Sequence, residues 1–218
     1  MDQPILKKVF TVLGIISTLY FLYQRYERSI QSNELKSISK LYYSGDLDSC
    51  EVLLLDFTER HPNNYGGWNF LGNVYLDDYR DSLAEPAYSK SLELEEDNVQ
   101  ALTGLGVVAR VRKDYARAEE YYEKAIKVNP KFAQSYSSLV VVKLINKNYD
   151  EAVELGERAW ELNSKELGIA GNLALAYHFK GFESKRDSLF NVLENRNYKD
   201  LSYLKMITSG LIKLEDVL

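Results

Sequence analysis

Residues of similar size recur along this chain at a spacing of 34. One column of leucines comprises Leu71, Leu105, Leu139 and Leu173. A column of large aromatic residues, interrupted by Gly156, comprises Tyr88, Tyr122 and Phe190. A period that several columns share is typical of a protein built from stacked structural repeats. The chain is therefore expected to form an array in which each unit is shielded from water by its neighbours.

Within one period, the apolar residues have helical spacing. Trp68, Leu71 and Tyr75 lie at i, i+3 and i+7, which places them on one face of a first helix. Ala84 and Tyr88 continue the pattern on a second helix, and the polar stretch 76–82 connects the two. In this connection Asp81 or Ser82 is expected to cap the second helix. Each unit is therefore expected to be a pair of helices.

Small residues accompany the large aromatic ones. Gly72 and Gly106 each follow a leucine of the repeated column. A glycine lets two helix backbones approach closely, so we expect the large residues Trp68, Tyr75, Tyr88 and Tyr122 to fill the gaps beside the small ones. The same argument applies to the lookalike of a dinucleotide-binding motif, G-x-G-x-x-A, at residues 104–109. That motif requires a preceding strand, whereas these residues fall inside a predicted helix, where they serve packing.

The residues W-x-x-L-G-x-x-Y at 68–75, followed by A-x-x-x-Y and by N-P in the next unit, resemble the tetratricopeptide repeat. The resemblance implies an all-α fold, a right-handed superhelix (α-solenoid) of helical hairpins with a concave groove. The expected units are 31–64, 65–98, 99–132, 133–166 and 167–200. Residues 201–218 would cap the open end, with a helix over 201–214. In this family the groove is lined by the first helix of each unit and binds a protein or peptide partner.

The resemblance also implies which residues line the groove. The groove candidates are Asn69, Asn73, Asp77, Gln100, Thr103, Val107, Arg110, Val111, Gln134, Ser137, Val141, Leu144, Ile145, Asn172, Leu175, His178 and Phe179. Members that bind chaperones hold a terminal carboxylate in a clamp of basic residues and asparagines. Asn73 fits that clamp, but its basic positions here are Asn69, Gly104, Gln134 and Ser138, so no such clamp is expected.

The candidates are polar at one end of the array and apolar at the other. The stretch LVVVKLI at 139–145 is apolar almost all round its helix, and such a helix must be covered on both faces. One face is covered by the stacked units. The other is covered either by an apolar helix of a partner or by the last helix of this chain, and both alternatives remain open.

An uncharged run at residues 9–23 follows Lys7 and Lys8 and ends before Arg25. A signal peptide has this layout, but no small-residue cleavage site follows the run. A buried helix of the folded domain is a further alternative. Because basic and aromatic residues flank the run, we expect residues 1–30 to form an apolar helix that anchors the chain in a membrane through residues 5–25. The flanking charges do not decide its orientation.

The remaining composition argues against other classes of protein. The net charge of −5 disfavours nucleic acid, and the basic residues between Arg110 and Arg117 are expected to lie in a solvated helix end and turn. Cys50, the single cysteine, is expected in the core. The two histidines, His61 and His178, suggest no metal site, and neither pairs with Cys50 as nucleophile and base. No cofactor, small-molecule substrate or enzymatic activity is therefore expected.

These observations favour a membrane-anchored adaptor or scaffold that binds its partner in the groove. One alternative is an assembly or oligomerisation subunit of a membrane complex that uses the end faces of the array. Another is a non-catalytic accessory protein of an enzyme, secretion or chaperone system. The sequence does not identify the partner or the oligomeric state.

Overall fold

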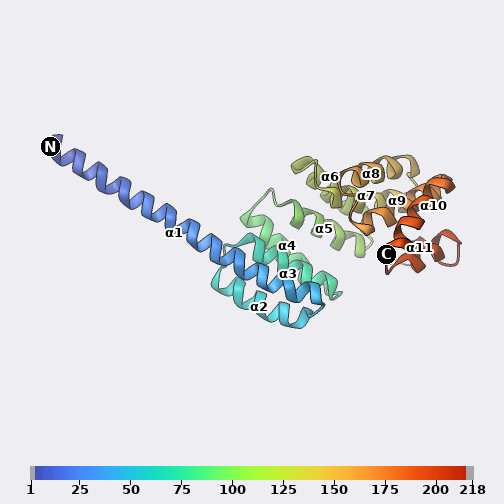
Figure 1. Cartoon of the computed structure of the whole chain (residues 1–218), viewed down its shortest axis with the longest axis horizontal. Helices are drawn as coiled ribbons and strands as arrows, with labels where there is room; N and C mark the ends of the chain where they lie inside the picture. The colour runs from blue at the N-terminus through green and yellow to red at the C-terminus, as the bar shows by residue number, and fades with distance from the viewer. Residues whose placement is uncertain (1–2, 215–218) are drawn as a thin grey trace. The chain divides into compact units, whose positions relative to one another are not determined.

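The computed structural model describes the backbone of residues 3–214 and the side chains of residues 17–214. The described residues form eleven α-helices and no strand (Figure 1). The all-α prediction is therefore confirmed for this part of the chain. Two compact units divide the chain, the first ending at Phe57 and the second beginning at Thr58.

The first unit contains α1 (Gln3–Ser44) and most of α2 (Leu47–Arg60). The boundary expected at residue 30 lies inside α1, which continues unbroken for 42 residues. Ile38, Leu54, Phe57 and Cys50 are buried. The Cys50 thiol donates a hydrogen bond to the carbonyl oxygen of Ile38 at 3.5 Å. Burial, with a smaller contribution from Asp46, raises the pKa of the Cys50 thiol. The prediction that Cys50 lies in the core is confirmed.

Side chains of α1 between residues 19 and 26 are exposed. Leu19, Tyr20, Phe21, Leu22 and Tyr23 follow one another along the helix and are 54–65% exposed, so they point in all directions around it. No helix within the described residues is long and apolar enough to cross a membrane. The expected anchor begins in residues 1–16, whose side chains lie outside the described part.

The second unit is built from antiparallel helix pairs, joined by turns of a few residues. The pairs are α3 (Tyr65–Asp77) with α4 (Asp81–Leu94), α5 (Val99–Val111) with α6 (Tyr115–Val128), α7 (Ala133–Ile145) with α8 (Tyr149–Leu162), and α9 (Leu167–Lys180) with α10 (Glu183–Asn195). Helices α4, α6 and α8 each also contact the odd-numbered helix that follows. The odd-numbered helices contact one another in series. We call the free side of the layer formed by α3, α5, α7 and α9 the inner face.

The turns repeat a backbone conformation as well as a sequence pattern. A positive φ recurs every 34 residues, at Gly45, Tyr79, Lys113, Lys147 and Gly181. Each of these residues lies just after the first helix of a pair, where a left-handed residue reverses the chain. Glycine adopts this conformation without strain, whereas Tyr79 and the two lysines do so at a cost of about 1–2 kcal/mol each.

Asparagines and an aspartate cap several of the helices. Asn64 accepts a hydrogen bond from the amide of Gly67 at 3.0 Å, and Asn98 accepts from the amides of Gln100 and Ala101. The cap predicted for α4 at Asp81 or Ser82 is wrong. The N-cap residue of α4 is Arg80, which makes no side-chain cap. Asp81 is the first residue of the helix, and its carboxylate accepts a hydrogen bond from Arg112.

The array ends with α11 (Leu201–Thr208), which is shorter than the helix expected over 201–214. It ends early because Gly210 has a φ of 75°, which reverses the chain. Leu201, Leu204 and Ile207 are buried against α9 and α10 in one apolar cluster that also includes Leu214.

Candidate functional site

Polar groove candidates join neighbouring helices of the inner face. Between α3 and α5, the Asn69 amide donates to Gln100 at 3.4 Å. Between α5 and α7, the hydroxyls of Thr103 and Ser135 lie 2.8 Å apart. Between α7 and α9, the Asn172 amide donates to the hydroxyl and the carbonyl oxygen of Ser137, at 3.0 and 3.2 Å. These hydrogen bonds join successive helix pairs, so they hold α3, α5, α7 and α9 in register. They also give hydrogen-bond partners to some of the polar groups of the inner face.

Three apolar groove candidates lie in the core instead of on an open surface. Val141, Leu144 and Leu175 are 7%, 3% and 3% exposed. Leu144 and Leu175 belong to the same apolar cluster as the buried residues of α11. These three side chains are therefore buried within the chain and present no exposed apolar surface to a partner helix.

The helix at 139–145 also contains a residue that its apolar pattern did not explain. Lys143 is 5% exposed, and its ammonium group lies 2.6 Å from Glu119 on α6 and 2.9 Å from Glu151 on α8. Burial lowers the pKa of Lys143, but the hydrogen bonds and charges of the two glutamates outweigh it and raise the pKa above its ordinary value. The buried lysine therefore links three helices and is not available to a ligand.

The candidates that remain accessible lie on all four helices of the inner face, α3, α5, α7 and α9. Asp77, Gln100 and Val111 are exposed. Those that are partly exposed are Asn73, Val107, Arg110, Gln134, Ile145, Asn172, His178 and Phe179. The accessible candidates are thus mixed, because amides and one arginine stand beside Val107, Val111, Ile145 and Phe179.

Two accessible candidates on α9 are engaged with neighbours. Arg186 of α10 donates a hydrogen bond to His178 Nδ1 at 3.2 Å, which requires a neutral imidazole. Burial and the positive charge of Arg186 lower the pKa of His178, against a smaller opposite effect of Glu183. Phe179 stacks on Tyr149, with ring centroids 5.7 Å apart. These contacts attach α9 to α8 and α10.

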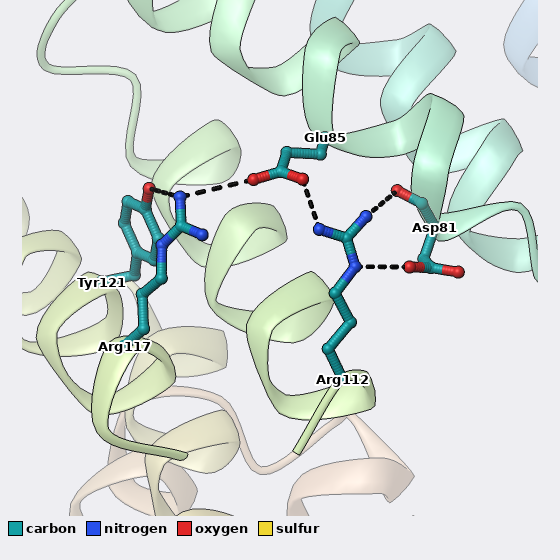
Figure 2. Close-up of polar contacts among 5 residues, drawn as sticks. All are labelled: Asp81, Glu85, Arg112, Arg117 and Tyr121. Atoms are coloured by element: carbon teal, nitrogen blue, oxygen red, sulfur yellow. Dashed lines mark hydrogen bonds and ion pairs between the residues drawn. The ribbon is translucent and has the colours of Figure 1, made fainter. Parts of the chain in front are cut away.

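The basic residues around the turn after α5 bind acidic residues of the preceding unit (Figure 2). Arg112 donates to Asp81 at 2.7 Å and also to Glu85, both on α4. Arg117 donates to Glu85 and to the Tyr121 hydroxyl, each at 3.3 Å. The interpretation of these basic residues as a solvated helix end missed this cluster. Its signal was the pair of carboxylates at 81 and 85, one helical turn apart and about 30 residues before the arginines.

The aromatic column behaves as the sequence predicts. A Cβ atom added at Gly72 would lie 2.7 Å from Cδ1 of Tyr88, and one added at Gly104 would lie 2.4 Å from Cζ of Tyr88. A Cβ atom added at Gly106 would lie 2.4 Å from Cε1 of Tyr122. The two rings therefore occupy the space that the glycines leave, and the packing role of residues 104–109 is confirmed.

The hydroxyls of Tyr88 and Tyr122 differ in their hydrogen bonding. Tyr88 donates to Asn73 Oδ1 at 2.7 Å. Within the described residues, the buried Tyr122 hydroxyl has no hydrogen-bond partner. Val107, which offers no acceptor, stands where Asn73 stands 34 residues earlier. Burial raises the pKa of Tyr122 to about 12, and the nearby Arg110 and Ser138 partly offset that effect.

The described residues contain no group of three or more histidine, cysteine, aspartate or glutamate side chains that could hold a metal ion. Together, the paired helices and the repeated turns define a helical-repeat protein, and its accessible groove candidates lie on the first helices of the pairs.

Comparison with known proteins identifies the repeat. Residues 99–132 and 132–174 each match a tetratricopeptide-repeat family, so the chain contains tetratricopeptide repeats, as its motif predicts. No curated protein matches the sequence. Proteins built from this repeat generally mediate protein–protein interaction, and the fold is typically a non-catalytic module.

Solved structures share the fold at low sequence identity. A tetratricopeptide-repeat protein of Thermus thermophilus is 17% identical, with a TM-score of 0.69 over 86% of this chain and 100% of that one. PilF of Pseudomonas aeruginosa is 17% identical, with a TM-score of 0.66 over 85% of this chain and 86% of that one. The MamA protein is 21% identical, with a TM-score of 0.55 over 79% of this chain and 94% of that one. The helical-repeat fold is therefore shared.

Proposed function

We propose that this chain is a non-catalytic scaffold that binds a protein partner on the inner face and attaches to a membrane through the apolar part of α1. The observation that carries the binding proposal is the set of accessible amides and the arginine on α3, α5, α7 and α9. Gln100 Oε1 already accepts from Asn69, and the Asn172 amide already donates to Ser137. The remaining donors and acceptors of Gln100, Gln134 and Asn172 match the main chain of an extended peptide. The buried apolar candidates favour such a polar ligand over an apolar helix.

The binding proposal can be tested by placing a photoreactive amino acid at Gln100 in the full-length protein. We expect irradiation of cells to attach a defined partner at this position. The matched control places the same group at Lys124, which is exposed on α6. Equal capture from both positions, or capture from Lys124 alone, would contradict binding on the inner face.

The membrane proposal rests on the exposed residues Leu19 to Tyr23, which surround α1 with apolar and aromatic surface. Water disfavours such a surface, whereas tyrosines and leucines are stable at a membrane interface. Flotation of the full-length protein with lipid vesicles tests this proposal. We expect Leu19→Glu with Leu22→Glu to abolish flotation, while Leu83→Glu, at an exposed site on α4, leaves it unchanged.

A second candidate function is assembly through the end of the array. α11 exposes Tyr203 at 54% and Met206 at 37%, and Leu211 beyond it is 74% exposed, although an end unit is expected to present a polar face. This apolar surface fits an assembly subunit. Sedimentation of the wild type and of Tyr203→Ser with Met206→Ser tests it, and an identical monomeric mass for both would exclude self-assembly there.

A further inference from the structure

Arg110 differs from the neighbouring arginines in having no acidic partner. It lies half-buried in the last turn of α5, on the inner face. In the part of the chain that the structure describes, no carboxylate forms an ion pair with its guanidinium group. By contrast, Arg112 and Arg117 both bind acidic residues of α4. A partly desolvated cation without a counter-ion is unfavourable unless a ligand supplies the negative charge.

The Tyr122 hydroxyl is a second group without a partner. Its side chain is 0% exposed, and the hydroxyl makes no hydrogen bond. The equivalent hydroxyl one unit earlier reaches Asn73, an accessible residue of the inner face. The Tyr122 hydroxyl therefore points toward the inner face, and Val107 offers it no acceptor. A buried donor of this kind typically indicates a missing acceptor.

The repeat geometry brings a third donor to the same place. The ring of Tyr88 ends against Gly104, and the residue equivalent to Gly104 one unit later is Ser138 on α7. The ring of Tyr122 crosses α5 at Gly106, and Arg110 lies one helical turn further along the same face. Arg110 and Ser138 both lower the pKa of the Tyr122 hydroxyl, which agrees with this placement.

We propose that Arg110, Tyr122 and Ser138 form a subsite that binds the carboxylate of an acidic side chain of the partner. All three groups can donate hydrogen bonds, and the arginine adds an uncompensated charge, so the subsite favours an anionic acceptor over a main-chain carbonyl. Because the Tyr122 hydroxyl is buried, the side chains around it must shift for a bound carboxylate to reach it. This proposal rests on the proposed function, because it specifies the partner's chemistry.

The subsite is not the clamp for a terminal carboxylate that chaperone-binding members use. The basic positions of that clamp are Asn69, Gly104, Gln134 and Ser138 in this chain, none of them basic. Arg110 lies at another position of its helix and acts with a tyrosine from the second helix of the pair.

The test uses a fluorescent peptide of alternating glutamate and alanine and its glutamine counterpart, both amidated at the C-terminus. Anisotropy with the full-length protein at low salt measures binding. We expect the glutamate peptide to bind more tightly, and Arg110→Gln to weaken that binding about tenfold. Arg158→Gln removes one exposed charge on α8 and should leave the affinity unchanged. Val107→Asn gives Tyr122 an internal acceptor, so it should weaken binding about threefold without loss of thermal stability.

The proposal is overturned if the two peptides bind equally, if neither binds, or if Arg110→Gln binds as well as Arg158→Gln. It is also overturned if a glutamine peptide with a free C-terminus binds as tightly as the glutamate peptide, since the ligand would then be a chain end. Cross-linking from Gln100 reports separately on the proposed function. A partner captured there with unchanged yield in the Arg110→Gln protein would preserve the scaffold function and reject the acidic subsite.

Discussion

The units at 65–98 and 99–132 use the same aromatic anchor in different ways. Tyr88 and Tyr122 are both fully buried, and each packs on a glycine of the first helix of its own unit. Tyr88 ends on Gly104 and donates to Asn73, whereas Tyr122 ends near Ser138 and has no acceptor. The difference shows that the packing of the ring and the hydrogen bonding of its hydroxyl are independent at this repeated position. Both units keep the ring packing, but only Tyr88 has a hydrogen-bond acceptor on the inner face.

The largest expected effect tests the shared part of this comparison. Tyr88→Ala and Tyr122→Ala should each lower the free energy of unfolding by about 4 kcal/mol, because each removes a fully buried ring. Urea unfolding followed by circular dichroism measures both. A loss below about 1 kcal/mol for either variant would mean that the two rings do not fill equivalent spaces.

A smaller effect is expected where the rings end. Gly104→Ala should lower the free energy of unfolding by about 2 kcal/mol, since the new Cβ atom would lie 2.4 Å from Cζ of Tyr88. Ser138→Ala, the matched change at the equivalent position, should stay within about 0.5 kcal/mol, because a Cβ atom is already accommodated there. Equal losses for the two variants would remove the distinction between the two ring ends.

The hydroxyls themselves give the next effect. Tyr88→Phe should cost about 1 kcal/mol, because it breaks the bond to Asn73. Tyr122→Phe should be neutral or slightly stabilising, because it removes a donor that has no acceptor. Chemical denaturation of both variants measures the difference.

A double-mutant cycle provides the control for the hydroxyl comparison. Val107→Asn should be more favourable by about 1 kcal/mol in the wild type than in the Tyr122→Phe background, because the new amide can accept only from the hydroxyl. A coupling energy near zero would mean that the Tyr122 hydroxyl does not face residue 107.

The smallest effect concerns a feature that the two units share. Tyr79→Gly and Lys113→Gly should each stabilise the protein by about 0.5–1 kcal/mol, because glycine relieves the strain of a positive φ and the greater freedom of the unfolded chain only partly offsets this gain. Gly181→Ala should have the opposite sign. Thermal unfolding measures all three, and a destabilised Lys113→Gly protein would show that the lysine side chain has a further role.

The comparison also shows where sequence patterns stop being informative about the groove. By position, Val141 and Leu144 belong to the same class of groove candidates as Gln100, yet both are buried. Leu144 also shares an apolar cluster with residues of α11. Their exposure depends on how closely successive helices approach and on how the segment after the last pair packs. The helical spacing of residues within one unit predicts neither the approach of successive helices nor the packing of the last segment.

The sequence by itself determined the paired helices, their 34-residue register and the roles of the glycines and tyrosines, because these follow from local periodicity and side-chain volume. Only the tertiary structure decided which polar groups are satisfied. Arg112 finds its carboxylates on the preceding unit, Lys143 is buried between two glutamates, and Tyr122 is left without an acceptor. A hydrogen bond or ion pair forms or fails when the distance between its two groups changes by a few tenths of an ångström. The groups lie on helices about 30 residues apart in the sequence, so packing between those helices sets the distance.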